Sequence, residues 1–76
     1  MTNLQRIRKE KGLSQSQLAK ASDINVRMIQ HYESEYRDIN NIKAISLYKL
    51  ANALGCDMIE LLELEPTEKT IEDAHF

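Results

Sequence analysis

Four side chains in the first half of the chain, three polar and one apolar, raise the question of what they contact. Val26, Arg27, Gln30 and His31 lie close together, and no nucleophile or metal-ligand pattern surrounds them. A guanidinium donates two parallel hydrogen bonds, a carboxamide donates and accepts, and an imidazole can do either. These groups favour recognition over catalysis, and what they contact depends on the elements that position them.

Helical signals run along most of the chain, whereas no alternating run of β-branched residues indicates a strand. The first, second and last predicted helices begin with a polar residue followed three positions later by Gln or Glu, which is the capping-box pattern. Asn25 can cap the third helix, and Asn40 or Asn41 precedes the fourth. Gly12 and Gly55 end two of the helices. We predict five short helices, at about residues 3–11, 15–22, 26–34, 42–54 and 58–64.

Apolar residues recur at helical spacing and predict one core for an all-α, five-helix domain. We expect this core to include Leu18, Ala19, Ile29, Tyr32, Leu50 and Leu54. The inner side of the fourth helix should also carry Ile45, Leu47 and Ala51. Residues 1–64 form the predicted domain, and residues 65–76 a weakly patterned acidic tail.

The connection between the second and third predicted helices spans only about residues 23–25. A connection this short makes two helices cross steeply, which is the geometry of a helix-turn-helix. Close crossing needs a small residue on the earlier of these two helices, where Ala19 lies. It also needs an apolar anchor under the turn, where Ile24 lies. Asp23 stands where the turn needs a residue that tolerates a positive φ.

If the apolar side of the third helix faces the core, its opposite face carries Val26, Arg27, Gln30 and His31. A helix with such a face can enter the major groove of DNA. Arg27 could then pair with guanine O6 and N7, Gln30 with adenine, and Val26 with a thymine methyl. His31 could contact a base or a phosphate. The alternative is an ordinary solvated face, which the small residue, the turn and the anchors together disfavour.

The size and charge of the chain limit its function classes. Its 76 residues suffice for one small domain with one core. The net charge is −2, but residues 1–37 sum to +3 and residues 38–76 to −5, so the N-terminal half could bind a polyanion. An unevenly charged solvated surface is the simpler alternative. One cysteine, early charged residues and no long apolar stretch lead us to expect a cytoplasmic protein without signal peptide or membrane span.

These motifs resemble the Cro and phage-repressor-like helix-turn-helix regulators, also called the XRE family. The family pattern R-x-x-x-G-L-S-Q-x-x-L-A is met at residues 8–19, and I-x-x-Y-E at residues 29–33. The resemblance covers about residues 4–62, through RDINN at 37–41 and LYKLANALGC at 47–56. It implies a lambda-repressor-like domain that binds specific double-stranded DNA, usually as a homodimer on a near-palindromic operator, and a regulator that represses transcription.

The resemblance also implies roles for residues outside the third helix. Gln15 matches the family's phosphate-clamping glutamine, and Arg37 matches a contact to the DNA backbone or minor groove. Asn25, at the start of the third helix, is a further phosphate candidate. Arg8 and Glu33 match a structural pair that ties the first helix to the recognition helix. The four side chains named at the outset match or adjoin the base-reading positions.

The chain departs from the family pattern in the turn, after the third helix and in the following connection. Asp23 and Glu35 stand where the family prefers glycine, and Glu35 adds negative charge near the expected phosphates. The connection at residues 37–46 is longer than in the compact phage proteins. The longer connection leaves the position of Arg37 undetermined, but it does not change the predicted fold.

Other functions have weaker support in the sequence. We expect no enzyme, cofactor or metal site, because two histidines and one cysteine lack ligand spacing and no nucleophile motif occurs. Cys56, after a helix-ending glycine, suits a small buried hydrophobe. The serious rival is an antitoxin or accessory module that binds a protein partner through the acidic C-terminal segment and also binds DNA. The complete motif set favours the regulator.

A homodimer is expected to form around the fifth predicted helix. One recognition helix reads too few base pairs for useful specificity, so two copies are the usual remedy. The apolar residues available for this interface are Met58, Ile59, Leu61 and Leu62.

Overall fold

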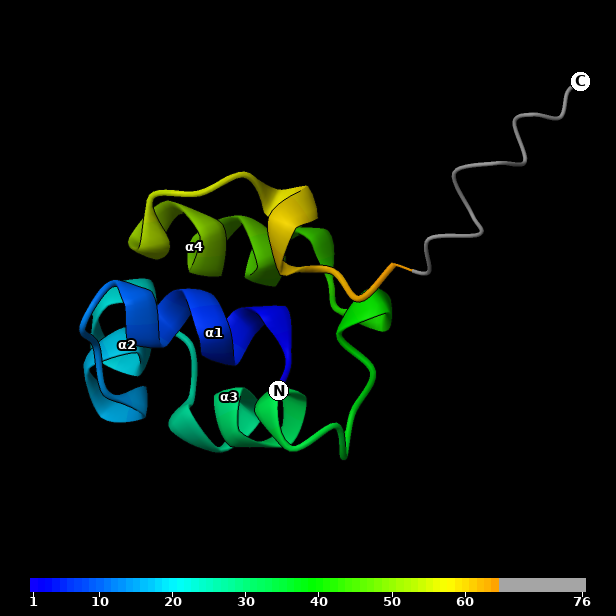
Figure 1. The fold of residues 1–76 in the computed structure, drawn as a ribbon, viewed down its shortest axis with the longest axis horizontal. Helices are drawn as coiled ribbons and strands as arrows, with labels where there is room; N and C mark the ends of the chain where they lie inside the picture. The colour runs from blue at the N-terminus through cyan, green and yellow to red at the C-terminus, as the bar shows by residue number, and fades with distance from the viewer. Residues whose placement is uncertain (65–76) are drawn as a thin grey trace, which may run out of the picture.

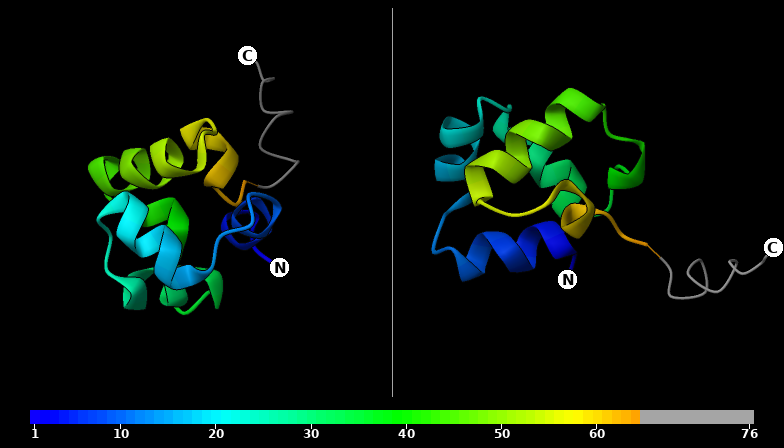
Figure 2. Two further views of the ribbon diagram at one scale, coloured as in Figure 1. Left: turned by 90° about the vertical axis from the view of Figure 1, so that its left-hand side faces the viewer. Right: turned by 90° about the horizontal axis from the view of Figure 1, so that it is seen from above.

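A computed structural model describes residues 1–64 of the protein, which contain four α-helices and two 3₁₀ helices. In chain order these are α1 (Asn3–Glu10), α2 (Gln15–Ser22), α3 (Val26–Glu33), η1 (Ile39–Asn41), α4 (Ala44–Leu54) and η2 (Met58–Leu61). In the view of Figure 1, α4 lies at the top and α3 at the bottom, and Figure 2 shows that α1 lies to one side of both. The predicted all-α class is confirmed for residues 1–64, where no strand occurs. Within this range, no helix has the length and apolar character needed to cross a membrane.

Side-chain caps start the first three helices. Thr2 Oγ1 accepts a hydrogen bond from a backbone N–H of α1 (3.1 Å), and Ser14 and Gln17 form a complete capping box at α2. At the start of α3, Asn25 Oδ1 accepts a hydrogen bond from the N–H of Arg27 (2.7 Å). These bonds satisfy amide groups that a helix leaves unpaired at its N-terminal end. The predicted starts of these helices are therefore confirmed.

A residue with left-handed backbone conformation follows each of the four α-helices, and three of these residues are followed by an N–H that bonds back into the helix. These three are Gly12 (φ 75°) after α1, Asp23 (φ 59°) after α2 and Gly55 (φ 68°) after α4. In each case the next N–H bonds back into the helix, as from Ile24 to the carbonyl of Ala19 (3.2 Å). Aspartate adopts this conformation at a smaller steric cost than most side chains. The positive φ predicted for Asp23 is confirmed.

One hydrophobic core joins the helices, and five of the elements each contribute one completely buried side chain to it. These are Leu4 of α1, Leu18 of α2, Ile29 of α3, Leu50 of α4 and Leu61 of η2. The predicted core residues belong to this cluster, although Ala19 is only partly buried against it. Helix α2 contacts α3 and α4, and η2 contacts α1 and α4. The two views in Figure 2 show how η2 closes the structure against α1.

The predicted fifth helix, residues 58–64, is wrong in type and length. Its capping box is present, but η2 is a single 3₁₀ turn that ends at Leu61. Beyond it, Asn40 Nδ2 donates to the carbonyl of Glu63 (3.0 Å), and the N–H of Glu63 donates to Asn40 Oδ1 (2.9 Å). These bonds take the place of a further helical turn. The predicted acidic tail, residues 65–76, lies outside the described residues.

The start of the fourth helix also differs from the prediction. Asn40 and Asn41 form part of η1, and α4 begins only at Ala44. Ile45, predicted to face the core, is 59% exposed, whereas Leu47 is buried. Two positions along a helix correspond to a rotation of about 200°, so these two side chains point to opposite sides. The helix packs through Leu47, which leaves Ile45 in solvent.

We expect Ala19→Leu to overpack the contact between α2 and α3, because Ala19 is partly buried against the core. Overpacking typically costs about 1–3 kcal/mol of unfolding free energy. Urea denaturation monitored by circular dichroism measures the change. Ala21→Leu is the matched control, because Ala21 lies in the same helix and is exposed. Equal midpoints for the two variants would contradict a close contact at Ala19.

Candidate nucleic-acid interface

One side of helix α3 packs into the core and sets the orientation of the helix. Ile29 and Tyr32 are buried in the core. The candidate side chains lie elsewhere on the helix: Arg27 and Gln30 are exposed, and Val26 and His31 are half-buried. Arg27 and Gln30 therefore lie on the surface side of α3, whereas Val26 and His31 are partly covered.

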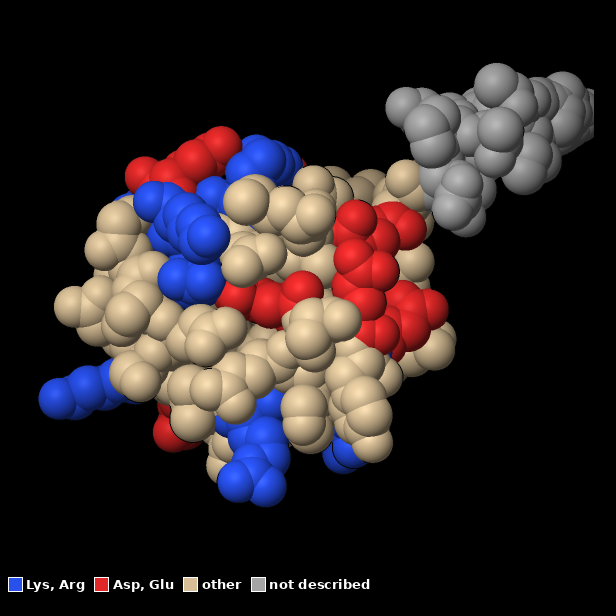
Figure 3. Space-filling model, turned by 60° about the horizontal axis from the view of Figure 1, so that its bottom comes forward, with Lys and Arg blue, Asp and Glu red and all other residues tan. Residues whose placement is uncertain are grey.

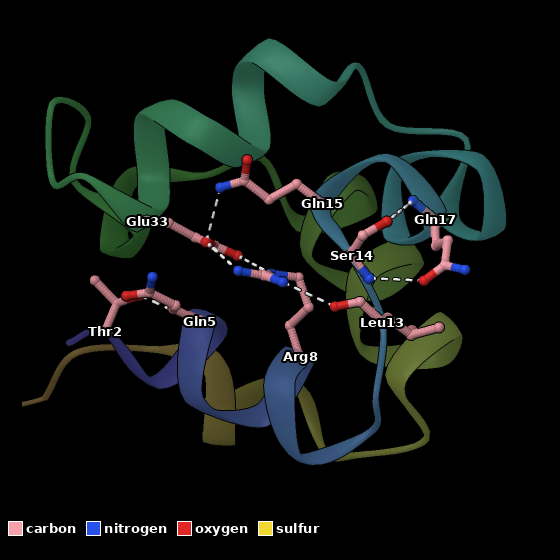
Figure 4. A network of polar contacts seen from close by, with 8 residues as sticks. All are labelled: Thr2, Gln5, Arg8, Leu13, Ser14, Gln15, Gln17 and Glu33. Atoms are coloured by element: carbon pink, nitrogen blue, oxygen red, sulfur yellow. Dashed lines mark hydrogen bonds and ion pairs between the residues drawn. The ribbon is translucent and has the colours of Figure 1, made fainter.

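A buried ion pair joins α1 to the C-terminal end of α3 (Figure 4). Arg8 Nε and Nη2 donate to the two carboxylate oxygens of Glu33 at 2.6 and 3.0 Å. Only 8% of the Arg8 side chain and 3% of the Glu33 side chain are exposed. Arg8 Nη1 also donates to the carbonyl of Leu13 (2.8 Å) in the connection to α2. The structure thus brings together Arg8 and Glu33 in the bidentate geometry typical of strong pairs.

The ion pair maintains the charge of Arg8. Its hydrogen bond to Glu33 raises the pKa of the guanidinium above the ordinary value, and this effect outweighs the lowering of the pKa by burial. Coulombic attraction from Glu33 raises this pKa further. A raised folded-state pKa stabilises the protein below the unfolded-state pKa, and this stabilisation is lost only as pH rises through the folded-state value. Arg8 is therefore charged throughout the neutral range.

Gln15, the first residue of α2, contacts the same carboxylate. Its Nε2 donates to Glu33 Oε1 at 3.0 Å, and Figure 4 shows Arg8 and Gln15 converging on Glu33. The second amide hydrogen and the Oε1 atom of Gln15 have no partner among the described residues. The side chain is half-buried, so its orientation is restricted while part of its hydrogen-bonding capacity is unused.

The chain reverses direction directly after α3. Glu35 has a left-handed backbone (φ 66°), and the N–H of Arg37 donates to the carbonyl of His31 (3.1 Å). The ring of Tyr36 lies against the imidazole of His31, with 4.8 Å between ring centroids. This reversal places Arg37, which is exposed, beside the C-terminal end of α3. Sequence reasoning missed Tyr36; the available signal was an aromatic residue directly before the candidate phosphate contact.

Basic and acidic side chains both lie on the side of the molecule that carries α3. Figure 3, turned to bring this side forward, shows lysine and arginine side chains reaching outward at its rim, a large acidic cluster from the centre to the right, and a second acidic patch beside basic side chains at the upper left. A pocket of about 420 Å³ beyond the end of α3 is lined by Glu35, Asp38 and Glu63, beside Arg37. Arg27 lies at the other end of the helix. Carboxylates therefore lie near both ends of α3, because Asp23 is exposed before its first turn and the pocket carboxylates lie beside Arg37 after its last.

Comparison with known proteins agrees with this geometry. A family model described as helix-turn-helix matches residues 4–61, which run from α1 to the end of η2. The chain belongs to the XRE-type helix-turn-helix family. The family assignment supports a DNA-binding transcriptional regulator as the general function.

A curated relative supports the same assignment. An uncharacterized HTH-type transcriptional regulator of Sinorhizobium fredii, named y4dJ, is 36% identical over 69 residues. The aligned region covers 91% of this chain and 83% of the relative. No solved structure matches the chain.

The remaining candidate for site chemistry is Cys56. The thiol is half-buried and packs against the core. Burial raises its pKa, and the nearby carboxylates of Glu60 and Asp57 raise it further. A raised pKa leaves little reactive thiolate at neutral pH, so Cys56 acts as a packing residue. Within residues 1–64, no group of three or more His, Cys, Asp and Glu side chains could hold a metal ion.

We expect Glu33→Ala to lower the unfolding free energy by about 3–5 kcal/mol, because it leaves the buried charge of Arg8 without a partner. Thermal and urea denaturation measure the loss. Arg6→Ala is the control, on α1 beside Arg8: Arg6 and Glu10 form an exposed pair at 3.2 Å. Such pairs contribute only about 0.3–0.5 kcal/mol. Similar losses in the two variants would show that the Glu33 pair is no more important than a surface contact.

Proposed function

We propose that this chain is a sequence-specific DNA-binding transcriptional repressor in which α2 and α3 form the helix-turn-helix. In this proposal α3 enters the major groove of double-stranded DNA. The observation that carries the proposal is the exposure of Arg27 and Gln30 on a helix whose opposite side is buried. A recognition helix needs both properties, because its polar groups must reach base edges while its backbone stays in place.

The base-reading roles follow from side-chain chemistry and position. Arg27 lies near the N-terminal end of α3, and its guanidinium can donate to guanine O6 and N7. Gln30, one turn further along, can pair with the N6 and N7 atoms of adenine. Val26 offers an apolar contact for a thymine methyl, and His31 offers a hydrogen bond near the end of the helix.

The phosphate contacts come from the ends of the helices. Gln15 lies at the start of α2, where backbone N–H groups and the helix dipole favour an anion. Its second amide hydrogen is free of described partners, and the bond to Glu33 restricts the side chain before DNA arrives. Asn25 caps α3 through Oδ1, so its Nδ2 group is the part that would contact a phosphate. Arg37 would hold a phosphate beyond the C-terminal end of α3.

Base recognition and phosphate binding can be distinguished by comparing two arginine variants. Arg27→Ala should cost about 1–3 kcal/mol on the preferred site and relax the preference at one base pair per half-site. Arg37→Ala should weaken all sequences nearly alike and reduce the slope of log affinity against log salt by about one unit per protomer. The preferred site is first selected from a random duplex pool, and affinities for selected and scrambled DNA are then measured at several salt concentrations.

Equal weakening of selected and scrambled DNA by Arg27→Ala would contradict a reading role for α3. Failure of the unmodified protein to select any sequence would overturn specific DNA binding itself. Repression is tested separately, by placing the selected site in a promoter and measuring reporter expression with and without the protein. Increased expression would overturn the repressor role alone.

The proposed DNA complex contains a homodimer, and only some of the apolar residues expected at its interface from the sequence are accessible. Leu61 is completely buried in the core of the protomer, so it cannot contact a second copy. Met58 and Leu62 are half-buried, whereas Ile59 is 62% exposed. Ile59 is therefore the residue of that set best placed for an interface.

We expect two protomers on each selected site, with half-sites about one helical turn, roughly 34 Å, apart. Ile59→Glu should place a charge in the interface and weaken cooperative binding of the second protomer. Ile45→Glu is the control, because Ile45 is an exposed isoleucine on α4. Stoichiometry and cooperativity are measured by mobility shift and analytical ultracentrifugation. A one-to-one complex on every selected sequence would contradict the dimer, and equal effects of the two variants would contradict this interface.

A further inference from the structure

An aromatic pair at the end of α3 links a base-reading candidate to the segment that follows the helix. Tyr36 is 77% exposed, yet its ring lies 4.8 Å from the imidazole of His31, centroid to centroid, with 52° between the ring planes. Tilted arrangements at this separation are favourable for aromatic rings. Tyr36 therefore packs on His31 and leaves most of its own surface in solvent.

The backbone around this pair restricts where Tyr36 can lie. The carbonyl of His31 accepts hydrogen bonds from the N–H of Arg37 (3.1 Å) and from the hydroxyl of Ser34 (3.3 Å). The N–H of Tyr36 donates to Ser34 Oγ (3.4 Å). The left-handed conformation of Glu35 provides the reversal that returns the chain to the helix. The contact between the two rings is thus supported by the fold of the whole turn.

We propose that Tyr36 is a positioning residue for His31, which makes His31 a specificity determinant at one edge of the DNA site. This inference rests on the proposed function. A half-exposed histidine without a neighbour samples several side-chain orientations and loses this freedom when it bonds to a base. The Tyr36 ring removes some of these orientations in advance. His31 therefore loses less side-chain entropy when it bonds to a base pair that matches the remaining orientation. The affinity for a base pair that needs another imidazole orientation is not increased by this restriction.

The contact is tested first in the free protein. Nuclear magnetic resonance of the imidazole protons of His31 should show a ring-current shift caused by Tyr36. Tyr36→Ala should remove this shift, whereas Tyr36→Phe should retain it because the phenyl ring can pack in the same place. An unchanged spectrum in Tyr36→Ala would overturn the positioning contact. The backbone amide spectrum of the same samples shows whether each variant is folded.

The role in specificity is tested on the selected DNA site by changing each base pair in turn. His31→Ala identifies the base pair whose identity His31 reads. At that base pair, Tyr36→Ala should reduce discrimination about two- to tenfold, which is the range expected for an aromatic pair. Tyr36→Phe should retain discrimination. In the His31→Ala background, Tyr36→Ala should have no further effect on discrimination, because its action passes through the imidazole.

The controls distinguish this inference from the proposed function. If Arg27→Ala reduces discrimination at its own base pair but Tyr36→Ala behaves like Tyr36→Phe, α3 reads DNA and the role of Tyr36 is overturned. Additive effects of Tyr36→Ala and His31→Ala would overturn it as well. A uniform loss of affinity in Tyr36→Ala, with a lower salt dependence, would show that Tyr36 acts on phosphate binding instead. If no sequence is selected by the unmodified protein, both the proposed function and this inference fail.

Discussion

The buried pair of Arg8 and Glu33 is the interaction on which the arrangement of the helices depends. Burying two charges is expensive, and mutual attraction offsets that cost only when the geometry is good and the remaining hydrogen-bonding groups are satisfied. Here the guanidinium bonds to both carboxylate oxygens and to the carbonyl of Leu13. Displacing α3 relative to α1 would leave charges and donors unpaired. The pair therefore makes the relative position of these helices a single, well-defined state.

The same carboxylate connects the stability of the fold to the candidate DNA interface. Glu33 accepts from Arg8 and from Gln15, so one side chain fixes the end of α3 and orients the start of α2. At the other end of α3, Asn25 caps the helix, and Ile24 anchors the preceding turn in the core. A helix restrained at both ends and along one side can present Arg27 and Gln30 without rearrangement. This favours recognition, because the helix loses little conformational entropy on binding.

Much of the fold was predictable because its signals are local. The caps at Thr2, Ser14 and Asn25 each act within three residues, and they mark the starts of three helices correctly. The positive φ of Asp23 followed from the short connection between α2 and α3. The surface side of α3 followed from helical periodicity, because the buried positions of a helix determine which positions remain outside. The pairing of Arg8 with Glu33 came from family resemblance alone, since an isolated Arg and Glu are more often unpaired.

The sequence by itself therefore determined the helical class, the starts of the first three helices and the side of α3 that faces solvent. Only the tertiary structure decided the conformation of residues 58–64. A helical pattern at residues 58–64 yields to a 3₁₀ turn and an extended segment, because Asn40 pairs with Glu63 across 23 positions of sequence. Ile45 lies in solvent and Leu61 in the core because the packing of α4 and η2 selects one side of each element. Likewise, the tilted contact of Tyr36 with His31 requires the backbone reversal at Glu35, and periodicity carries no signal for such a reversal.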